Sequence, residues 1–183
     1  IAREAIADVK QYIKLGSVLP DANMSWRNDF RWGNVNFGFL VSARLGGVVF
    51  SRTQAILDNF GVSEATAAAR DAGGTLINGN DLVDANKWYS AIGGGNSIPQ
   101  YYTYSATNVR LQEASIGYTF PRKMLGGLCE LSLSLVGRNL WMIYNKAPFD
   151  PETIATTDNY YQGIDYFMMP SMRNIGFNLR LKF

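Results

Sequence analysis

The feature that most constrains the fold of this chain is the alternation of apolar with polar or small residues along several stretches. In the clearest stretch, every second residue is apolar: Ile175, Phe177, Leu179, Leu181 and Phe183. Successive side chains of a β-strand point to opposite faces, so a period of two predicts strands with one apolar face. The alternation predicts an all-β fold, with strands over residues 24–33, 35–45, 108–120, 128–140 and 173–183.

The connections between the predicted strands alternate between short and long. Gly33-Asn34 and residues 121–127 are expected to be tight turns, because both contain glycine next to a short polar stretch. Residues 46–106 and 143–171 are expected to be long loops. Loops of that length are uncommon inside compact domains and usually serve a function.

The first long loop is predicted to contain two short helices, Thr53–Phe60 and Glu64–Ala72. Ser63 is a suitable N-cap for the second helix, and Gly73-Gly74 is a suitable stop. Near the N-terminus, Ile1 to Tyr12 are compatible with either a short helix or an irregular strand and loop.

Several features favour a membrane barrel over a soluble antiparallel sheet with a helical insertion. No apolar run approaches the roughly 18–20 residues of a membrane helix, but barrel strands need only about ten alternating residues. Outer-membrane barrels also have short turns on the periplasmic side and long loops outside. Aromatic residues lie near the ends of the apolar faces, as in interfacial girdles: Trp26, Trp32, Tyr118, Phe120 and Phe183.

Composition argues against several functional classes. The chain has 17 Lys and Arg against 15 Asp and Glu, scattered without a block of one sign, which does not fit a nucleic-acid binder. It has no histidine and one cysteine, so the commonest general base and metal ligand are missing. We therefore predict no enzyme activity, no metal and no cofactor. Cys129 is predicted to be a small hydrophobic residue on an apolar face.

Several segments together resemble the C-terminal part of SusC/RagA-type TonB-dependent transporters. They occur in the order seen in that family: Arg44-Leu45-Gly46-Gly47, Ala69 to Gly74, Asn108 to Pro121, Val136 to Trp141, Asp150-Pro151-Glu152, Pro170 to Arg173 and Leu181-Lys182-Phe183. Each segment is weakly specific alone, and their order makes the set specific. Met172 departs from the family, which often has proline there.

The resemblance implies that the chain forms the last strands of a transmembrane β-barrel of about 22 strands, with one long extracellular loop containing short helices. The plug domain and the TonB segment would lie outside residues 1–183. The family imports nutrients, often oligosaccharides or peptides, across the outer membrane of Bacteroidetes-type gram-negative bacteria. Implied partners are the remaining barrel and plug, a SusD-like surface lipoprotein, the TonB complex and membrane lipid, with no nucleic acid.

Five strands of a lipid-facing sheet would leave two open edges. In hydrocarbon each unsatisfied backbone group costs several kcal/mol, so the sheet needs further strands from the rest of the barrel. The resemblance implies that the last strand pairs with the first strand of the barrel.

Two sets of residues are candidates for function. The aromatic Phe183 at the end of an alternating strand resembles the signal read by the barrel-assembly machinery, although a girdle residue would look the same. Five tyrosines in the long loops could contact substrate or a lid protein: Tyr101, Tyr102, Tyr104, Tyr160 and Tyr161. They could equally pack the loops together.

Three further sets are predicted to be structural. Glu113 is expected to lie in a satisfied polar network on the polar face of its strand. The oxygen-rich cluster of Asn78, Asn80, Asp81 and Asp84 lacks calcium-loop order, and Gly93-Gly94-Gly95 lacks the ending of a phosphate loop. The alternative hypothesis for the whole chain is a soluble carbohydrate-binding or adhesin-like β domain, whose apolar faces would pack against each other.

Overall fold

A computed structural model of the chain describes residues 14–95, 98–156, 158 and 161–183. The helix or strand considered for Ile1 to Tyr12 and the role predicted for Tyr160 lie outside these residues. The chain divides into two compact units. The sheet unit comprises Leu19–Gly47, Ala106–Glu152 and Pro170–Phe183. Among the described residues, the helical unit comprises 14–18, 48–95, 98–105, 153–156, 158 and 161–169.

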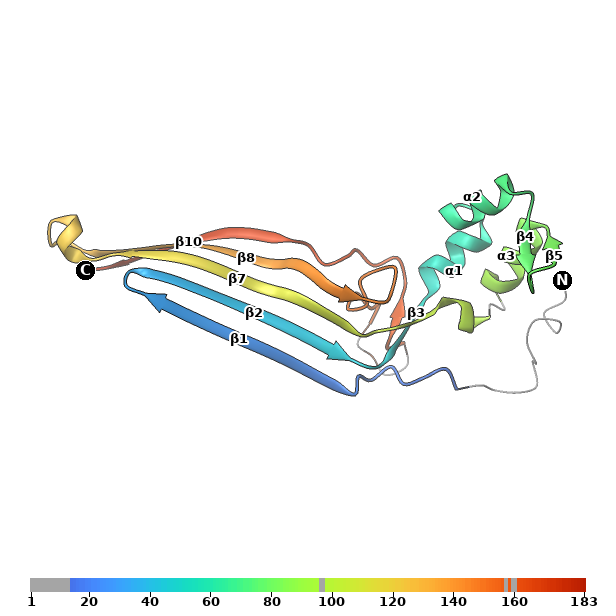
Figure 1. Ribbon diagram of the computed structural model, residues 1–183, viewed down its shortest axis with the longest axis horizontal. Coiled ribbons are helices and arrows are strands. Elements are labelled where there is room, and N and C mark those ends of the chain that lie inside the picture. The colour runs from blue at the N-terminus through green and yellow to red at the C-terminus, as the bar shows by residue number, and fades with distance from the viewer. Residues whose placement is uncertain (1–13, 96–97, 157, 159–160) are drawn as a thin grey trace. The chain divides into compact units, whose positions relative to one another are not determined.

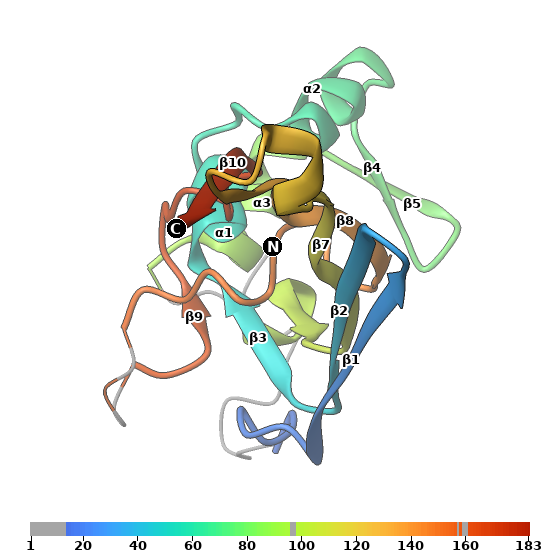
Figure 2. The same ribbon diagram turned by 90° about the vertical axis from the view of Figure 1, so that its left-hand side faces the viewer.

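The sheet unit contains five long antiparallel strands in the order β1-β2-β7-β8-β10 (Figure 1). Their bounds are β1 Ala22–Trp32, β2 Val35–Leu45, β7 Asn108–Phe120, β8 Glu130–Asn145 and β10 Asn174–Lys182. β1 and β2 lie side by side in both views (Figure 1, Figure 2). β8 continues to Asn145, beyond the expected end at residue 140, because Trp141 and Tyr144 pair with Leu111 and Val109 of β7.

The two short turns lie at the same end of the sheet (Figure 1). β1 and β2 are joined at Gly33, whose φ of 58° is a conformation that favours glycine. β7 and β8 are joined through the 3₁₀ turn η3, Arg122–Leu125, and by Gly126 and Gly127, which also have positive φ. The long connections leave from the other end, as the alternation of short and long connections predicts.

The strand register aligns apolar side chains into rows that cross the whole sheet. One row consists of Phe30, Phe37, Ile116, Leu135 and Phe177. The neighbouring row on the opposite side consists of Arg31, Asn36, Gly117, Ser134 and Asn178. We call these sides the apolar face and the polar face. Because antiparallel partners project to the same side, a period of two in each strand becomes two chemically distinct surfaces.

The apolar face is exposed rather than buried. Phe177 is 80% exposed, Leu135 is 54% exposed and Trp32 is 89% exposed. In the described part of the sheet unit, the strands form one layer, with no second sheet packed on these side chains (Figure 1). A soluble β-sandwich would bury this face against its partner sheet, so the exposure separates this sheet from a sandwich core.

The helical unit contains short elements around a small core. Its elements are β3 Val48–Ser51, α1 Arg52–Asn59, α2 Glu64–Asp71, β4 Thr75–Ile77, β5 Asp81–Val83, α3 Ala85–Gly93, η2 Pro99–Tyr102, β6 Thr103–Ser105 and β9 Ile164–Asp165. The order β6-β3-β9 forms one small sheet, and β4 pairs with β5. The core is formed by Ala55, Trp88, Ile92, Ile98 and Tyr102. None of the described helices is long and apolar enough to cross a membrane.

Each of the α-helices α1, α2 and α3 begins at a side chain that accepts a hydrogen bond from its first turn. Ser51 accepts from the Gln54 amide at 3.1 Å, and Ser63 accepts from the Thr66 amide at 3.2 Å. Asp84 accepts from the Lys87 amide at 3.0 Å, and this cap starts α3, a helix that the sequence pattern did not predict. N-caps of this type typically stabilise a helix by about 1 kcal/mol.

The glycine run at the end of α3 offers a matched pair of substitutions. A Cβ on Gly93 would lie 2.4 Å from the carbonyl oxygen of Ala55 in α1, whereas a Cβ on Gly95 would meet nothing within 4 Å. We expect Gly93→Ala to destabilise the packing of α1 on α3 by about 1–3 kcal/mol, because neither backbone can yield easily. Limited proteolysis of the purified protein should therefore cut Gly93→Ala faster within residues 48–105. Gly95→Ala is the control, and equal cleavage of both variants would contradict the packing argument.

Candidate functional site

The polar face of the sheet unit carries a row of charges that crosses the strands. Glu113 in β7 lies opposite Arg138 in β8, and its Oε2 accepts from Arg138 Nε at 3.1 Å. Its other oxygen lies 3.9 Å from the guanidinium of Arg27 in β1. Arg27 also donates to Asp29 at 2.9 Å. Glu113 thus sits between two guanidinium groups, in the kind of paired network expected for it.

The regular pairing breaks at Gln112, next to this row. On one side, β2 pairs Leu40 with Glu113 and then Val41 with Leu111, so Gln112 has no partner. On the other side, β8 pairs Arg138 with Glu113 and then Trp141 with Leu111. Relative to β2, Gln112 is therefore the extra residue of a β-bulge, a device that redirects side chains. Relative to β8, Gln112 stands opposite two residues, 139 and 140, so the register shifts on that side as well. The bulge places Arg110 on the polar face together with Glu113, although the two are three positions apart.

Asn139 lies opposite this bulge and has a φ of 53°, a conformation that costs energy for a residue with a Cβ. Both the oxygen and the nitrogen of its side-chain amide form hydrogen bonds. Its oxygen accepts from Arg110 at 3.0 Å, and its nitrogen donates to the carbonyl oxygens of Ser171 at 3.0 Å and Met172 at 3.4 Å. These three hydrogen bonds help to hold the left-handed backbone.

Arg110 is the centre of a buried polar cluster at the loop end of the sheet. Only 3% of the residue is exposed. Its NH2 group lies 2.6 Å from Asp150 Oδ1 and 3.5 Å from Glu152 Oε2. Its NH1 group donates to Asn139 and, at 3.4 Å, to the hydroxyl of Ser171. Hydrogen-bonded Arg–carboxylate pairs of this kind are strong and directional when desolvated.

Asp150 completes the cluster from the second long connection. It accepts from the backbone N–H of Ser171 at 3.4 Å and from the Ser171 hydroxyl, in addition to the Arg110 guanidinium. Burial alone would raise the pKa of Asp150, but the hydrogen bonds from Ser171 and Arg110 outweigh it and lower the pKa. The carboxylate therefore stays charged, and it joins residues 150–152 and 171 to the sheet.

An open depression of about 360 Å³ lies beside this cluster on the polar face. It is lined by Leu40, Arg110, Gln112, Glu113, Arg138, Asn139, Glu152, Ser171 and Met172. The lining combines both signs of charge, amides and two apolar side chains, and it includes no aromatic residue. Such a mixture can hydrogen-bond a polar ligand without stacking on it.

The tyrosines predicted to contact a substrate or a lid have different surroundings. Tyr102 is 2% exposed in the core of the helical unit, which favours the loop-packing alternative for this residue. Burial, followed by the nearby charge of Asp58, raises its pKa. Tyr104 donates to Gln54 at 2.6 Å, and burial raises its pKa as well. Tyr101 is 46% exposed and packs edge-on against Trp88, while Tyr161 is 55% exposed.

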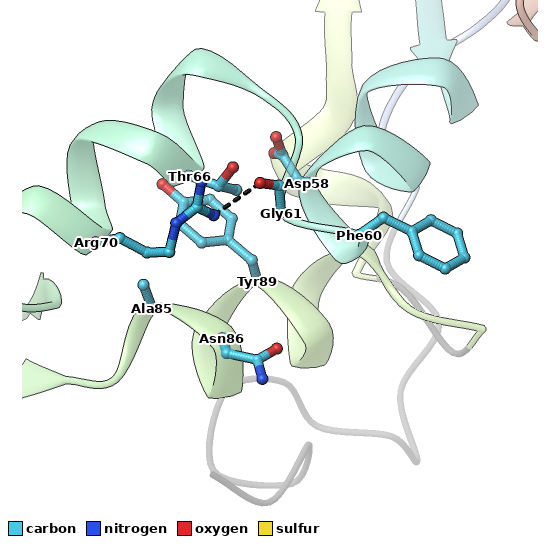
Figure 3. Close-up of a pocket in the computed structure, with 8 residues that line it drawn as sticks. All are labelled: Asp58, Phe60, Gly61, Thr66, Arg70, Ala85, Asn86 and Tyr89. Carbon is cyan, nitrogen blue, oxygen red and sulfur yellow. Dashed lines mark hydrogen bonds between the residues drawn. The ribbon is translucent and has the colours of Figure 1, made fainter.

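A second pocket, of about 270 Å³, lies among the helices of the helical unit (Figure 3). Arg70 of α2 donates to the carbonyl oxygen of Gly61 at 2.7 Å, shown as the dashed line in Figure 3. This bond connects α2 to the turn that follows α1. Tyr89 of α3 lines the same pocket and makes a longer contact, 3.5 Å, to the carbonyl of Ala65. Arg70 and Tyr89 thus both donate to backbone carbonyl oxygens, and these contacts connect the helices.

Two further residues singled out in the sequence have structural roles in α3. Asp84 caps α3, and Gly93 allows the close approach of α3 to α1. Among the described residues, no group of three or more acidic or cysteine side chains could hold a metal ion. Cys129 is a free, half-buried thiol. Phe183 follows β10 and is 84% exposed, and its role in assembly stays a prediction.

Sequence reasoning missed the bulge at Gln112, although a signal was present. Apolar residues of β7 occur at 109, 111, 114 and 116, so the spacing changes from two to three between Leu111 and Ala114. A change of phase by one residue inside an alternating strand indicates a bulge. The partners of Arg110 gave no comparable signal, because Asp150 lies 40 positions and Ser171 lies 61 positions further along the chain.

Comparison with known proteins agrees with the resemblance found in the motifs. The chain is 28% identical over 186 aligned positions to TonB-dependent receptor P3 of Formosa agariphila, covering 92% of this chain. It spans only 17% of the length of that relative. The structure matches the RagAB peptide importer in its open-open state with a TM-score of 0.67 and 15% identity, covering 97% of this chain and 20% of that one.

No family model matches the sequence. The predicted fold class is confirmed by the structural match and by the mainly β architecture of the sheet unit. The similarity to TonB-dependent transporters extends through almost the whole chain. At 15% identity, the match to RagAB shows the fold alone.

The Arg110 cluster predicts how the second long connection responds to pH. Because the folded pKa of Asp150 is below its ordinary value of 3.8, its contribution to stability is present above that pH and disappears as the pH falls through the folded pKa. Asp150→Asn should loosen residues 146–173 by about 1–3 kcal/mol at neutral pH. The variant should also lose the wild-type pH dependence of this opening.

Hydrogen–deuterium exchange of peptides from residues 146–173, corrected for intrinsic exchange rates, measures this opening directly. Asp158→Asn, which changes an exposed carboxylate in the same connection, is the control. Wild-type protection that stays constant from pH 7 to well below the ordinary pKa of an aspartate would refute the role assigned to Asp150.

Proposed function

We propose that this chain forms part of the barrel wall of a TonB-dependent importer in the outer membrane of a Bacteroidetes-type bacterium. The apolar face of the sheet unit would contact lipid, and the polar face would line the lumen. The observation that carries the proposal is the exposed apolar row that crosses all five strands, from Phe30 to Phe177.

Energetics supports lipid as the medium around this face. Exposed apolar surface is unfavourable in water by about 25 cal/mol per Å², and monomeric soluble proteins rarely expose apolar patches larger than a few hundred Å². Large side chains along every strand of this sheet are more than two-fifths exposed, including Phe37, Ile116 and Leu179. Contact with acyl chains removes this cost without a second protein layer.

The edges of the sheet support the proposal that further strands complete a barrel. Within the described residues, β1 and β10 each pair on one side only. Open strand edges are not tolerated in hydrocarbon, because unsatisfied backbone groups cost several kcal/mol each. The remainder of the barrel would satisfy both edges, with the last strand pairing to the first strand of the complete barrel.

The connections suggest an orientation in the membrane. Barrels of this class have short turns on the periplasmic side and long loops outside. The turns at Gly33 and at residues 121–127 would then be periplasmic. The long connections 46–106 and 146–173 would be extracellular, and the helical unit with Tyr101 and Tyr161 would be accessible to a lid protein or a solute.

The partners follow from the same proposal. A SusD-like surface lipoprotein would cover the extracellular side, and the TonB complex would supply energy through a part of the protein outside this chain. The relatives support transport rather than catalysis, since one is described as a TonB-dependent receptor and the other as a peptide importer. The cargo would be a peptide or an oligosaccharide.

Adjacent residues of β8 provide a matched test of the lipid-facing surface. Leu135 belongs to the apolar face, and Ser134 belongs to the polar face. In the protein expressed from its complete gene, Leu135→Arg should prevent assembly in the outer membrane, because arginine facing lipid costs about 2–4 kcal/mol near the bilayer midplane. Ser134→Arg should assemble normally, since its side chain faces the lumen.

Assembly can be measured as the heat-modifiable form recovered in the outer-membrane fraction. A soluble β domain predicts a different result, because Leu135 is already 54% exposed and arginine would be harmless there. Equal recovery of Leu135→Arg and Ser134→Arg would therefore reject the barrel-wall function.

A further inference from the structure

The depression beside Gln112, which we call the bulge pocket, has features that a plain barrel wall does not need. A β-bulge interrupts both ladders of β7 at Gln112, and a non-glycine residue in the left-handed region, Asn139, lies opposite. Bulges are over-represented next to active sites, and strained backbone concentrates at functional sites. Both features occur at one level of the sheet and flank one open depression on the polar face.

The bulge pocket contains polar atoms that make no hydrogen bond or ion pair within the described residues. The side-chain amide of Gln112 makes no hydrogen bond within the described residues, and it is exposed. Arg138 uses only Nε, towards Glu113, which leaves both of its terminal NH2 groups available. Glu152 contacts Arg110 through Oε2 alone. A ligand would thus meet an amide, a guanidinium and a carboxylate oxygen.

The floor of the pocket is held in place by the buried cluster beneath it. Arg110, 3% exposed, is hydrogen-bonded to Asn139, Ser171 and Asp150, so these groups position the pocket rather than contact a ligand. Gln112 and Arg138 belong to the strands β7 and β8, and Glu152 lies next to Asp150, which is hydrogen-bonded to Arg110. Preorganisation of this kind lowers the entropy cost of binding.

The chemistry of the lining indicates the class of ligand. Gln112 can both donate to and accept from a peptide amide, as an amide side chain does. The guanidinium of Arg138 suits a carboxylate, the carboxylate of Glu152 suits an ammonium group, and the exposed Met172 can contact an aliphatic side chain. A purely anionic or cationic ligand would meet a like charge, and no aromatic ring is present for a sugar to stack on.

We propose that the bulge pocket is a subsite for an extended peptide, with Gln112 and Arg138 as its specificity-determining residues. This inference rests on the proposed transport function, in which the polar face lines the lumen. The side-chain amide of Gln112 hydrogen-bonds to the peptide main chain. Arg138 binds carboxylate groups of the peptide, and Glu152 binds its ammonium groups.

The test uses the detergent-purified protein expressed from its complete gene, incubated with a tryptic digest of casein. Peptides retained after gel filtration are quantified by mass spectrometry, with maltohexaose as a parallel probe. We expect the wild type to retain peptides and to retain no maltohexaose. Gln112→Ala should lower peptide retention at least about fivefold, since one or two hydrogen bonds are lost. Gln112 makes no contact that the fold needs, so this variant should assemble normally.

Arg138→Gln should shift the retained set away from peptides with acidic side chains. The controls are Asn178→Ala and Arg180→Gln, which change the polar face near the short turns and should retain peptides as the wild type does. Retention that Gln112→Ala and Arg138→Gln leave unchanged would overturn the subsite. Retention of maltohexaose that Gln112→Ala abolishes would overturn the peptide class, and retention of neither probe would overturn the proposal. Assembly of Leu135→Arg and Ser134→Arg reports separately on the transport function.

Discussion

Antiparallel pairing in a fixed register is the constraint on which the sheet unit depends. Each strand contributes alternating side chains, and the register joins them into rows such as Phe30, Phe37, Ile116, Leu135 and Phe177. A slip by one residue would mix the two faces and place charges among the apolar side chains. If the apolar face contacts lipid, as we propose, an arginine on that side would cost about 2–4 kcal/mol, and the surrounding medium would specify the register strongly.

The cluster around Arg110 explains how this sheet supports a long connection. Holding a connection as long as residues 146–173 in one conformation costs conformational entropy, so it needs specific contacts. Asp150 and Ser171 each reach the same buried guanidinium, so the two ends of the connection are fixed by one group. Removing either the Asp150 carboxylate or the Arg110 guanidinium takes from its buried partner the shortest charged contact, and the remaining hydrogen bonds of the cluster do not replace it.

Much of the sheet could be predicted from the sequence, because strand periodicity is a local signal. The fold class is confirmed, and β2 and β7 lie within residues 35–45 and 108–120, where apolar residues alternate except for the break at Gln112. The helix α3 was missed because its N-cap, Asp84, belongs to a polar stretch that resembles a loop. The burial of Tyr102 and the partners of Arg110 depend on contacts between distant segments, on which periodicity carries no information.

The break in alternation at Gln112 shows why a functional position can look like an irregularity. A strand with perfect alternation would leave Arg110 and Glu113 on opposite faces, and the guanidinium could not remain among the polar groups of the wall. The extra residue brings both to the polar face and leaves the Gln112 amide without a partner in the described fold. Barrel geometry alone requires neither the bulge nor the left-handed backbone of Asn139. Both are accounted for if this level of the wall contacts a ligand that an unbroken strand could not hydrogen-bond.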